Sequence, residues 1–219
     1  MTDTLFINAR LIDPVAQTDL MGALLVSDGV ISQVFEDPQP VVKGAVVMNC
    51  AGHCLAPGIV DIGVKVSEPG ERHKESFRSA GRAAAAGGVT TIVTRPDTLP
   101  AIDTPETLEF AARRAALDAP VRVLPMAALT KGRMGQEMTE IGFLQDAGAV
   151  GFTDCDRVVT NTKVFNRALT YAKSLDALVI AHVQEPVLSE GAAVTSGKFA
   201  SLRGLPSVSP MAERMALDR

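Results

Sequence analysis

The stretch Gly87-Gly88-Val89-Thr90-Thr91-Ile92-Val93 decides the fold class of this sequence of 219 residues. The paired glycines predict the end of a helix over 74–86, and the β-branched run after them predicts a buried strand. The alternation of strands and helices continues on both sides of this stretch. Further strands are expected at 59–64, 121–125, 149–152 and 177–181, and further helices from Thr104-Pro105 and over 137–146, 162–173 and 210–218.

Strands that alternate with helices are typical of parallel α/β folds. Five such units in series predict the N-terminal half of a (β/α)8 TIM-type barrel over residues 56–219, with about five of its eight strands. The alternative is an open doubly wound sheet, but no Gly-x-Gly-x-x-Gly motif follows the first strand. An incomplete barrel would expose an unpaired strand edge, so we expect the chain to be a fragment of a longer protein, or another segment to cover that edge.

The first 55 residues have a different pattern, with short apolar runs at 5–7, 22–26, 30–35 and 45–48. Asp28-Gly29 stands between two of these runs, which is a strong hairpin signal. We therefore expect a small β-sandwich domain over residues 1–55. Its strands are few, so it needs partners from elsewhere in the complete fold.

Composition excludes several classes of function. The formal net charge is −4 and there is no basic run, so nothing favours nucleic-acid binding. Apolar runs are too short to span a membrane, and the N-terminus lacks the pattern of a signal peptide. Three cysteines, Cys50, Cys54 and Cys155, predict reduced thiols and a cytoplasmic protein. Cys50-x-x-His53-Cys54 has no second half, so it does not indicate a zinc site.

Function in such barrels lies at the carboxyl ends of the strands. The polar residues expected there include Lys65, Arg95, Asp97, Asp154 and His182. A loop after the third strand, Lys131-Gly132-Arg133, could contact an anion.

Several motifs, in order along the chain, resemble the dihydroorotases of the cyclic amidohydrolase superfamily. They are Ala56-Pro57-Gly58-Ile59-Val60-Asp61, Glu68-Pro69-Gly70-Glu71, Gly87-Gly88-Val89-Thr90-Thr91, Pro96-Asp97-Thr98, Gly151-Phe152-Thr153-Asp154 and Ala181-His182. The resemblance implies a metal-dependent barrel with a small β-sandwich built from both chain ends. It also implies that this chain covers about the first half of the family's length.

The departures from the family pattern fall on its functional residues. The family pattern Asp-x-His-x-His-x-Arg-Glu-Pro-Gly has Gly63, Lys65 and Ser67 in place of the two zinc-binding histidines and the substrate-binding arginine. Asp97 stands where the family has a substrate-binding asparagine. By the same resemblance, Asp154 and His182 are vestigial metal ligands.

A catalytic zinc needs about three protein ligands and an open position for water. Glycine offers no donor atom and a protonated lysine repels a dication. Without the metal, water is not activated at neutral pH. Ser67 lacks the cationic fork that would hold a carboxylate, and Asp97 would add a like charge. We therefore expect no catalytic residue and no cofactor, and we predict that the Lys65 ammonium neutralises Asp154.

The resemblance implies the role of a catalytically inactive dihydroorotase homologue. It would act as a non-catalytic partner of aspartate carbamoyltransferase in pyrimidine biosynthesis, with a homo-oligomer as a further expectation. The alternative is an active, zinc-dependent cyclic amidohydrolase that interconverts carbamoyl aspartate and dihydroorotate. A hydantoinase- or allantoinase-like relative meets the same objection, because it too is expected to keep the paired histidines.

Overall fold

The computed structural model describes residues 3–219. The chain divides into two compact units, Met1–Gly58 and Ile59–Arg219, and each is described by itself.

The first unit is one five-stranded sheet. Its strands are β1 (Thr4–Asp13), β2 (Thr18–Ser27), β3 (Val30–Phe35), β4 (Val46–Asn49) and β5 (Cys54–Leu55). The order is β3-β2-β1-β4, and β5 also pairs with β1. β1, β2 and β3 form an antiparallel meander through two pairings, whereas β4 and β5 run parallel to β1.

The hairpin expected at Asp28-Gly29 is confirmed. Both residues have positive φ, 51° and 77°, as the tight turn between β2 and β3 requires. Glycine adopts this conformation at no steric cost, which explains its place in the turn.

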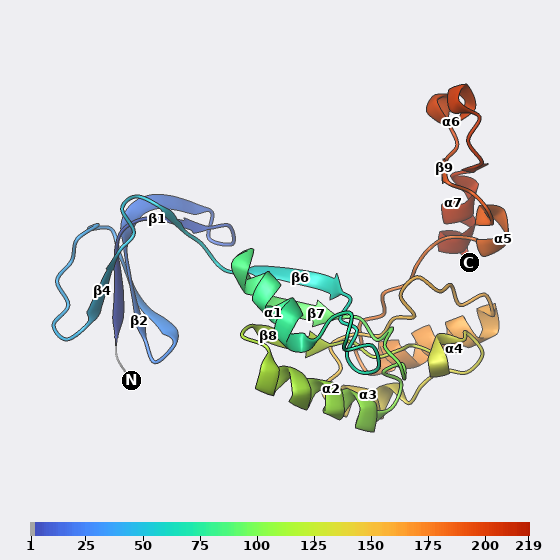
Figure 1. Cartoon of the computed structure of the whole chain (residues 1–219), viewed down its shortest axis with the longest axis horizontal. Helices are drawn as coiled ribbons and strands as arrows, with labels where there is room; N and C mark the ends of the chain where they lie inside the picture. Colours follow the sequence, from blue (N-terminus) through green and yellow to red (C-terminus); the bar gives the residue numbers. More distant parts are fainter. Residues whose placement is uncertain (1–2) are drawn as a thin grey trace. The chain divides into compact units, whose positions relative to one another are not determined.

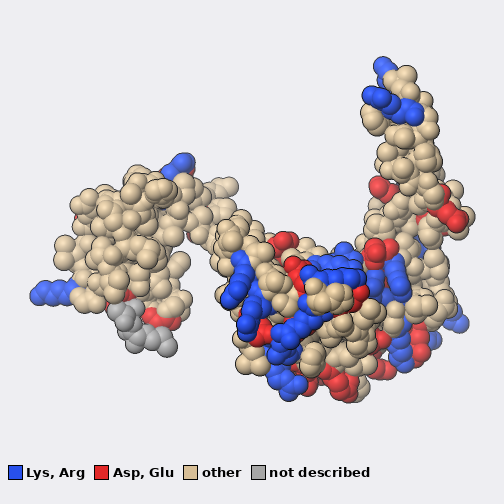
Figure 2. Space-filling view, viewed as in Figure 1, with Lys and Arg blue, Asp and Glu red and all other residues tan. Residues whose placement is uncertain are grey.

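The two faces of this sheet differ in burial. One face holds a small core of Leu5, Ala23 and Leu25. On the other, Met48, Phe6, Leu24 and Val34 face one another across four strands. Met48 and Val34, at the ends of this row, are 52% and 55% exposed, and few charged side chains cover the side of the unit in view in Figure 2. The described residues of this unit form a single sheet, so the expected sandwich stays a prediction.

The second unit begins with three parallel strands, β6 (Ile59–Val64), β7 (Val89–Thr94) and β8 (Arg122–Pro125), in that spatial order. Parallel bridges Ala127–Phe152 and Phe152–Val179 continue the order. The segments 149–152 and 177–181 were expected as full strands. They are reduced to single bridges, because the ladder on each side of Phe152 extends over one residue only.

Helices follow the strands as expected. They are α1 (Phe77–Ala86), α2 (Pro105–Asp118), α3 (Ile141–Asp146), α4 (Thr162–Ser174) and α7 (Met211–Asp218). α1 packs on β7 and α2 on β8 (Figure 1). The remaining elements are η1 (Lys131–Arg133), α5 (Pro186–Ser189), β9 (Val194–Thr195), α6 (Lys198–Arg203) and β10 (Ser207–Val208).

Capping residues set the helix ends. Thr104 caps α2, with Pro105 in its first turn, as predicted. α1 begins later than expected, because Ser76 accepts a hydrogen bond from the Ser79 N–H and so takes the N-cap position.

Residues 3–219 contain no helix with the length and apolar character that crossing a membrane requires.

A buried carboxylate ties the loop after β6 to two helices. Glu68 is only 5% exposed as a side chain, and its oxygens accept hydrogen bonds from the Phe77 N–H at 3.0 Å and from Arg114 Nε at 3.3 Å. Arg72 adds an ion pair at 3.5 Å. This contact fixes the loop that carries residues 65–70 beside the strand ends.

Candidate functional site

A cavity of about 420 Å³ lies at the carboxyl ends of the strands, where barrels of this type carry their function. Its polar lining includes Arg95 from the end of β7, Cys155 and Asp156 from the loop after Phe152, and His182. Gly63 of β6 forms part of its wall.

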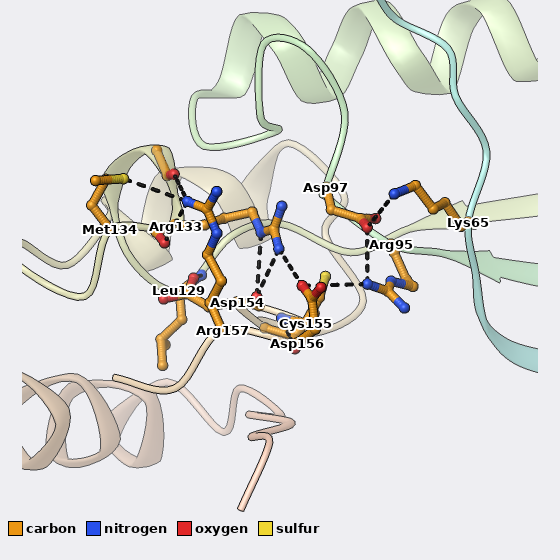
Figure 3. A network of polar contacts seen from close by, with 12 residues as sticks. Lys65, Arg95, Asp97, Leu129, Arg133, Met134, Asp154, Cys155, Asp156 and Arg157 are labelled. Atoms are coloured by element: carbon orange, nitrogen blue, oxygen red, sulfur yellow. Dashed lines mark hydrogen bonds and ion pairs between the residues drawn. The ribbon is translucent and has the colours of Figure 1, made fainter. Parts of the chain in front are cut away.

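Asp97 is the shared partner of two cations at this end of the sheet (Figure 3). Its Oδ2 lies 3.2 Å from Nζ of Lys65 and 2.8 Å from Nη2 of Arg95. The Asp97 side chain is 4% exposed, whereas Lys65 is 57% exposed. A carboxylate this deeply buried needs compensation, and the two cations supply it.

Two further arginines, Arg133 and Arg157, continue the network toward the loop after Phe152 (Figure 3). Arg95 lies 3.7 Å from Asp156, and Arg133 of η1 donates to Asp156 at 2.7 Å. Arg133 also donates twice to the Asp154 carbonyl, at 3.2 and 3.1 Å. Arg157 donates to the carbonyl oxygen of Arg133 at 3.3 Å. The loop Lys131-Gly132-Arg133 is thereby fastened to residues 154–157.

The Asp154 carboxylate faces the backbone of the loop after β8. Its Oδ1 accepts from the N–H groups of Leu129 and Thr130, both at 3.0 Å, and its Oδ2 accepts from the Thr130 hydroxyl. Burial raises the pKa of this carboxyl above its ordinary value, although these hydrogen bonds oppose the shift.

The prediction that Lys65 neutralises Asp154 is wrong. The ion-pair partner of Lys65 is Asp97, and Asp154 is satisfied by three donors from residues 129 and 130. Hydrogen bonds from backbone N–H groups and a hydroxyl stabilise a buried carboxylate without a cation. Sequence spacing does not reveal such donors, because residues 129 and 154 are far apart along the chain.

His182 is exposed, and its Nε2 lies 3.1 Å from Oε1 of Gln184. His182 and Asp154 line a second, very small pocket together with Arg157 and Arg219. The structure therefore brings the two expected ligand residues to one place. Within residues 3–219, no group of three His, Cys, Asp or Glu side chains is arranged to hold a metal ion.

The backbone at Gly63 differs from a regular strand. Its φ is +94°, and the pairing of β6 with β7 shifts register between Ile62 and Val64. Any side chain at position 63 would be strained in this conformation, even though a Cβ there would meet no atom within 4 Å. The sequence reveals the missing donor atom but not this bulge.

Ser67 is half-buried in the loop after β6, and its carbonyl accepts from the Glu71 N–H at 2.8 Å. It is absent from the residues that line the cavity of about 420 Å³. The sequence places Arg95 at the end of its strand and Arg133 in a loop that could contact an anion, but it gives Cys155 no role at the site. Burial raises the pKa of the Cys155 thiol, and the adjacent Arg95 opposes this shift.

A metal ion does not suit this donor set. At the two positions that the family pattern assigns to histidine, Gly63 has no donor and the Lys65 ammonium is bound to Asp97. The Asp154 carboxylate already accepts three hydrogen bonds. Lys65 and Arg95 pair with Asp97, and Arg95 and Arg133 pair with Asp156 (Figure 3).

Solved structures with a similar fold include hydantoinases and a dihydroorotase. L-hydantoinase from Arthrobacter aurescens superposes with a TM-score of 0.79 at 20% identity, covering 100% of this chain and 49% of that chain. A dihydroorotase structure gives 0.58 at 16% identity, covering 100% of this chain and 62% of that chain. The α/β fold is thus that of part of an amidohydrolase barrel.

The sequence comparison narrows this class to one family. The model of the Dihydro-orotase-like family matches residues 52–216, and the chain belongs to that family. The resemblance to dihydroorotases is confirmed.

Curated relatives carry the same names. The dihydroorotase of Syntrophobacter fumaroxidans is 35% identical, over 98% of this chain and 50% of the relative. The dihydroorotase of Anaplasma phagocytophilum is 38% identical, over 98% and 48%. A dihydroorotase-like protein of Pseudomonas putida is 37% identical, over 97% and 50%. The chain spans about half the length of the curated relatives it matches.

Proposed function

We propose that this protein is a dihydroorotase homologue without metal-dependent hydrolysis, and that it serves as a non-catalytic partner of aspartate carbamoyltransferase in pyrimidine biosynthesis. The observation that carries the first part is the pairing of Lys65 and Arg95 with Asp97 at the strand ends. Two fixed cations there repel a dication, and they engage a carboxylate that could otherwise attract one.

The charge balance of the site works against zinc. A binding site for a dication needs ligands that are neutral or negative once deprotonated. Here two cations, Lys65 and Arg95, share one buried carboxylate, Asp97. Gly63 and Lys65 also remove two imidazoles of the family pattern, so the set is short of donors as well as positively charged.

The partnership is supported by the family and by the nature of the fold. Relatives that are 35% and 38% identical to this chain are named dihydroorotase, and the family resemblance implies pyrimidine biosynthesis for that name. A barrel that performs no chemistry still offers a rigid surface for docking. We place the protein in the cytoplasm, since Cys50, Cys54 and Cys155 are free thiols. A homo-oligomer is part of the same proposal.

We also propose that the sheet of Met1–Gly58 is one layer of a β-sandwich. The row Met48, Phe6, Leu24 and Val34 is apolar across four strands, and its two ends are more than half exposed. Such a face is typical of a sheet that packs on a second layer. C-terminal strands of a longer chain would supply that layer.

The test is metal analysis and an activity assay on the intact protein. We expect substoichiometric zinc after purification in zinc-containing buffer, no ring opening of dihydroorotate with added zinc, and co-elution with aspartate carbamoyltransferase. The dihydroorotase of Syntrophobacter fumaroxidans is the positive control for the assay. Stoichiometric zinc with turnover would establish the alternative, an active cyclic amidohydrolase. Failure to co-elute would reject the partnership alone.

A further inference from the structure

We propose that the cleft between the starts of helices α3 and α4 binds a small zwitterion, namely an amino acid with an apolar side chain. The cleft has a volume of about 330 Å³ and shares no lining residue with the cavity of about 420 Å³ at the strand ends. Its lining combines charged and apolar side chains, among them Glu137, Met138, Glu140, Lys163, Val164 and Arg167. The inference does not depend on the proposed function.

The two walls of this α3–α4 cleft carry opposite charges. Glu137 and Glu140 come from the segment that leads into α3. Lys163 and Arg167 lie four residues apart on α4, so both cations are on one face of that helix. Glu137 is already paired with Lys131, outside the cleft. Within residues 3–219 the other three charged groups of the lining form no ion pair, so both signs of charge stay available to a ligand.

Both walls are held in place by the fold. Thr139 lies between the two glutamates, and its buried hydroxyl donates to the Ala128 carbonyl oxygen at 2.8 Å. Asn161 caps α4 and accepts a hydrogen bond from the Lys163 N–H, which fixes the first turn of that helix. α3 and α4 also pack in the same apolar core. A ligand therefore meets charges on an ordered backbone, which lowers the entropy cost of binding.

The lining favours a ligand that carries both charges and an apolar part. The ammonium of a zwitterion would meet Glu140, while its carboxylate would meet Lys163 and the planar guanidinium of Arg167. An ion of one sign would be attracted by one wall and repelled by the other. Met138 and Val164 add apolar surface, which favours an aliphatic side chain on the ligand. The volume of about 330 Å³ is within the range of small-molecule sites, roughly 300–1,000 Å³.

The experiment titrates L-leucine into the intact protein and follows the Met138 methyl group by NMR, with isotope-labelled methionine methyl groups. Met138→Leu assigns the resonance. Two control ligands keep the same side chain: leucinamide lacks the carboxylate, and isocaproate lacks the ammonium. We expect a saturable shift of the Met138 resonance with leucine, and binding at least about threefold weaker for each control ligand, as for the loss of an ion pair open to solvent. The Met21 methyl group, in the other unit, is expected not to respond.

Variants test whether the binding is in the cleft. Arg167→Gln and Glu140→Gln are each expected to weaken leucine binding about threefold to fivefold. Both side chains are exposed, so neither change disturbs the core, and urea denaturation of each variant verifies this. Arg113→Gln and Glu109→Gln, at exposed positions of α2, are the matched controls and are expected to leave binding unchanged.

The absence of saturable leucine binding would overturn the inference, as would binding of isocaproate or leucinamide as strong as that of leucine. Leucine binding that Arg167→Gln and Glu140→Gln leave unchanged, or that the two α2 controls weaken equally, would also overturn it. The proposed function would stand in each of these cases, because zinc content and turnover of dihydroorotate decide that question.

Discussion

Lys65 and Asp97 form an ion pair across the ends of two neighbouring strands, with Nζ 3.2 Å from Oδ2. In the family pattern these positions hold a histidine and an asparagine, so both departures meet in one contact. The like charge that Asp97 was expected to present to a ligand is offset inside the protein by Lys65 and Arg95. The substitutions therefore compensate each other electrostatically.

Replacing Asp97 by Asn tests how much this ion pair contributes to the free energy of unfolding. Lys65 and Arg95 would lose their shared carboxylate and remain as neighbouring cations. We expect a loss of about 1–3 kcal/mol in the free energy of unfolding, measured by urea denaturation. Glu137→Gln, which removes an exposed partner of Lys131, is the control and is expected to cause little change. Equal effects of the two variants would contradict the role given to Asp97.

The bulge at position 63 predicts a cost for any side chain there. Gly63→Ala is expected to destabilise the protein by about 1–3 kcal/mol, because φ is +94°. The control is Gly87→Ala: Gly87 has φ −89° and its added Cβ would be in ordinary contact, so a change within about 0.5 kcal/mol is expected. The measurement is thermal or urea unfolding of the two variants in parallel. A harmless alanine at position 63 would show that the strand there is regular.

Asp154 predicts a dependence of stability on pH. Its pKa in the folded state is raised by burial above the ordinary value of 3.8, so the folded state binds its proton more tightly than the unfolded state does. Stability relative to Asp154→Asn is therefore highest at acidic pH and declines as the pH rises through the folded-state pKa. Urea denaturation of both proteins, from acidic to neutral pH, measures this difference. A difference that grows with pH would mean that the hydrogen bonds from residues 129 and 130 outweigh burial.

Glu68 and Glu71 lie in the same loop but differ in their contacts, so Glu71 serves as the control for Glu68. Glu68→Gln is expected to cost about 2 kcal/mol, because the buried carboxylate serves the Phe77 N–H, Arg114 and Arg72. Glu71→Gln removes only the contact with Lys74 and is expected to change stability little. Hydrogen exchange of the Phe77 amide gives a second readout, and we expect it to accelerate in Glu68→Gln alone.

Local signals in the sequence were sufficient for the elements that depend on local chemistry. The cap at Thr104, the turn at Asp28-Gly29 and the glycine stop after α1 all follow from residues within a few positions of one another. The reduction of 149–152 to one bridge at Phe152 could not be read in this way, because pairing there depends on the register of two other segments.

The candidate site likewise combines features that follow from residue type alone with features that depend on distant parts of the chain. The loss of ligands at positions 63 and 65 is visible in the sequence, because residue type alone decides it. The partner of Lys65 is not, since Lys65 and Asp97 are brought together only by the parallel pairing of β6 with β7. The sequence places Arg95 at a strand end beside Asp97, but its second carboxylate, Asp156, lies in a distant loop and could not be assigned to it from the sequence.

The bulge at Gly63 opposes the return of a side chain to that position. A histidine at position 63 would put a side chain on a backbone with φ +94°, so a relaxed imidazole there would also need a different backbone conformation. Regaining a metal ligand at this position therefore requires two changes, one in the residue and one in the backbone.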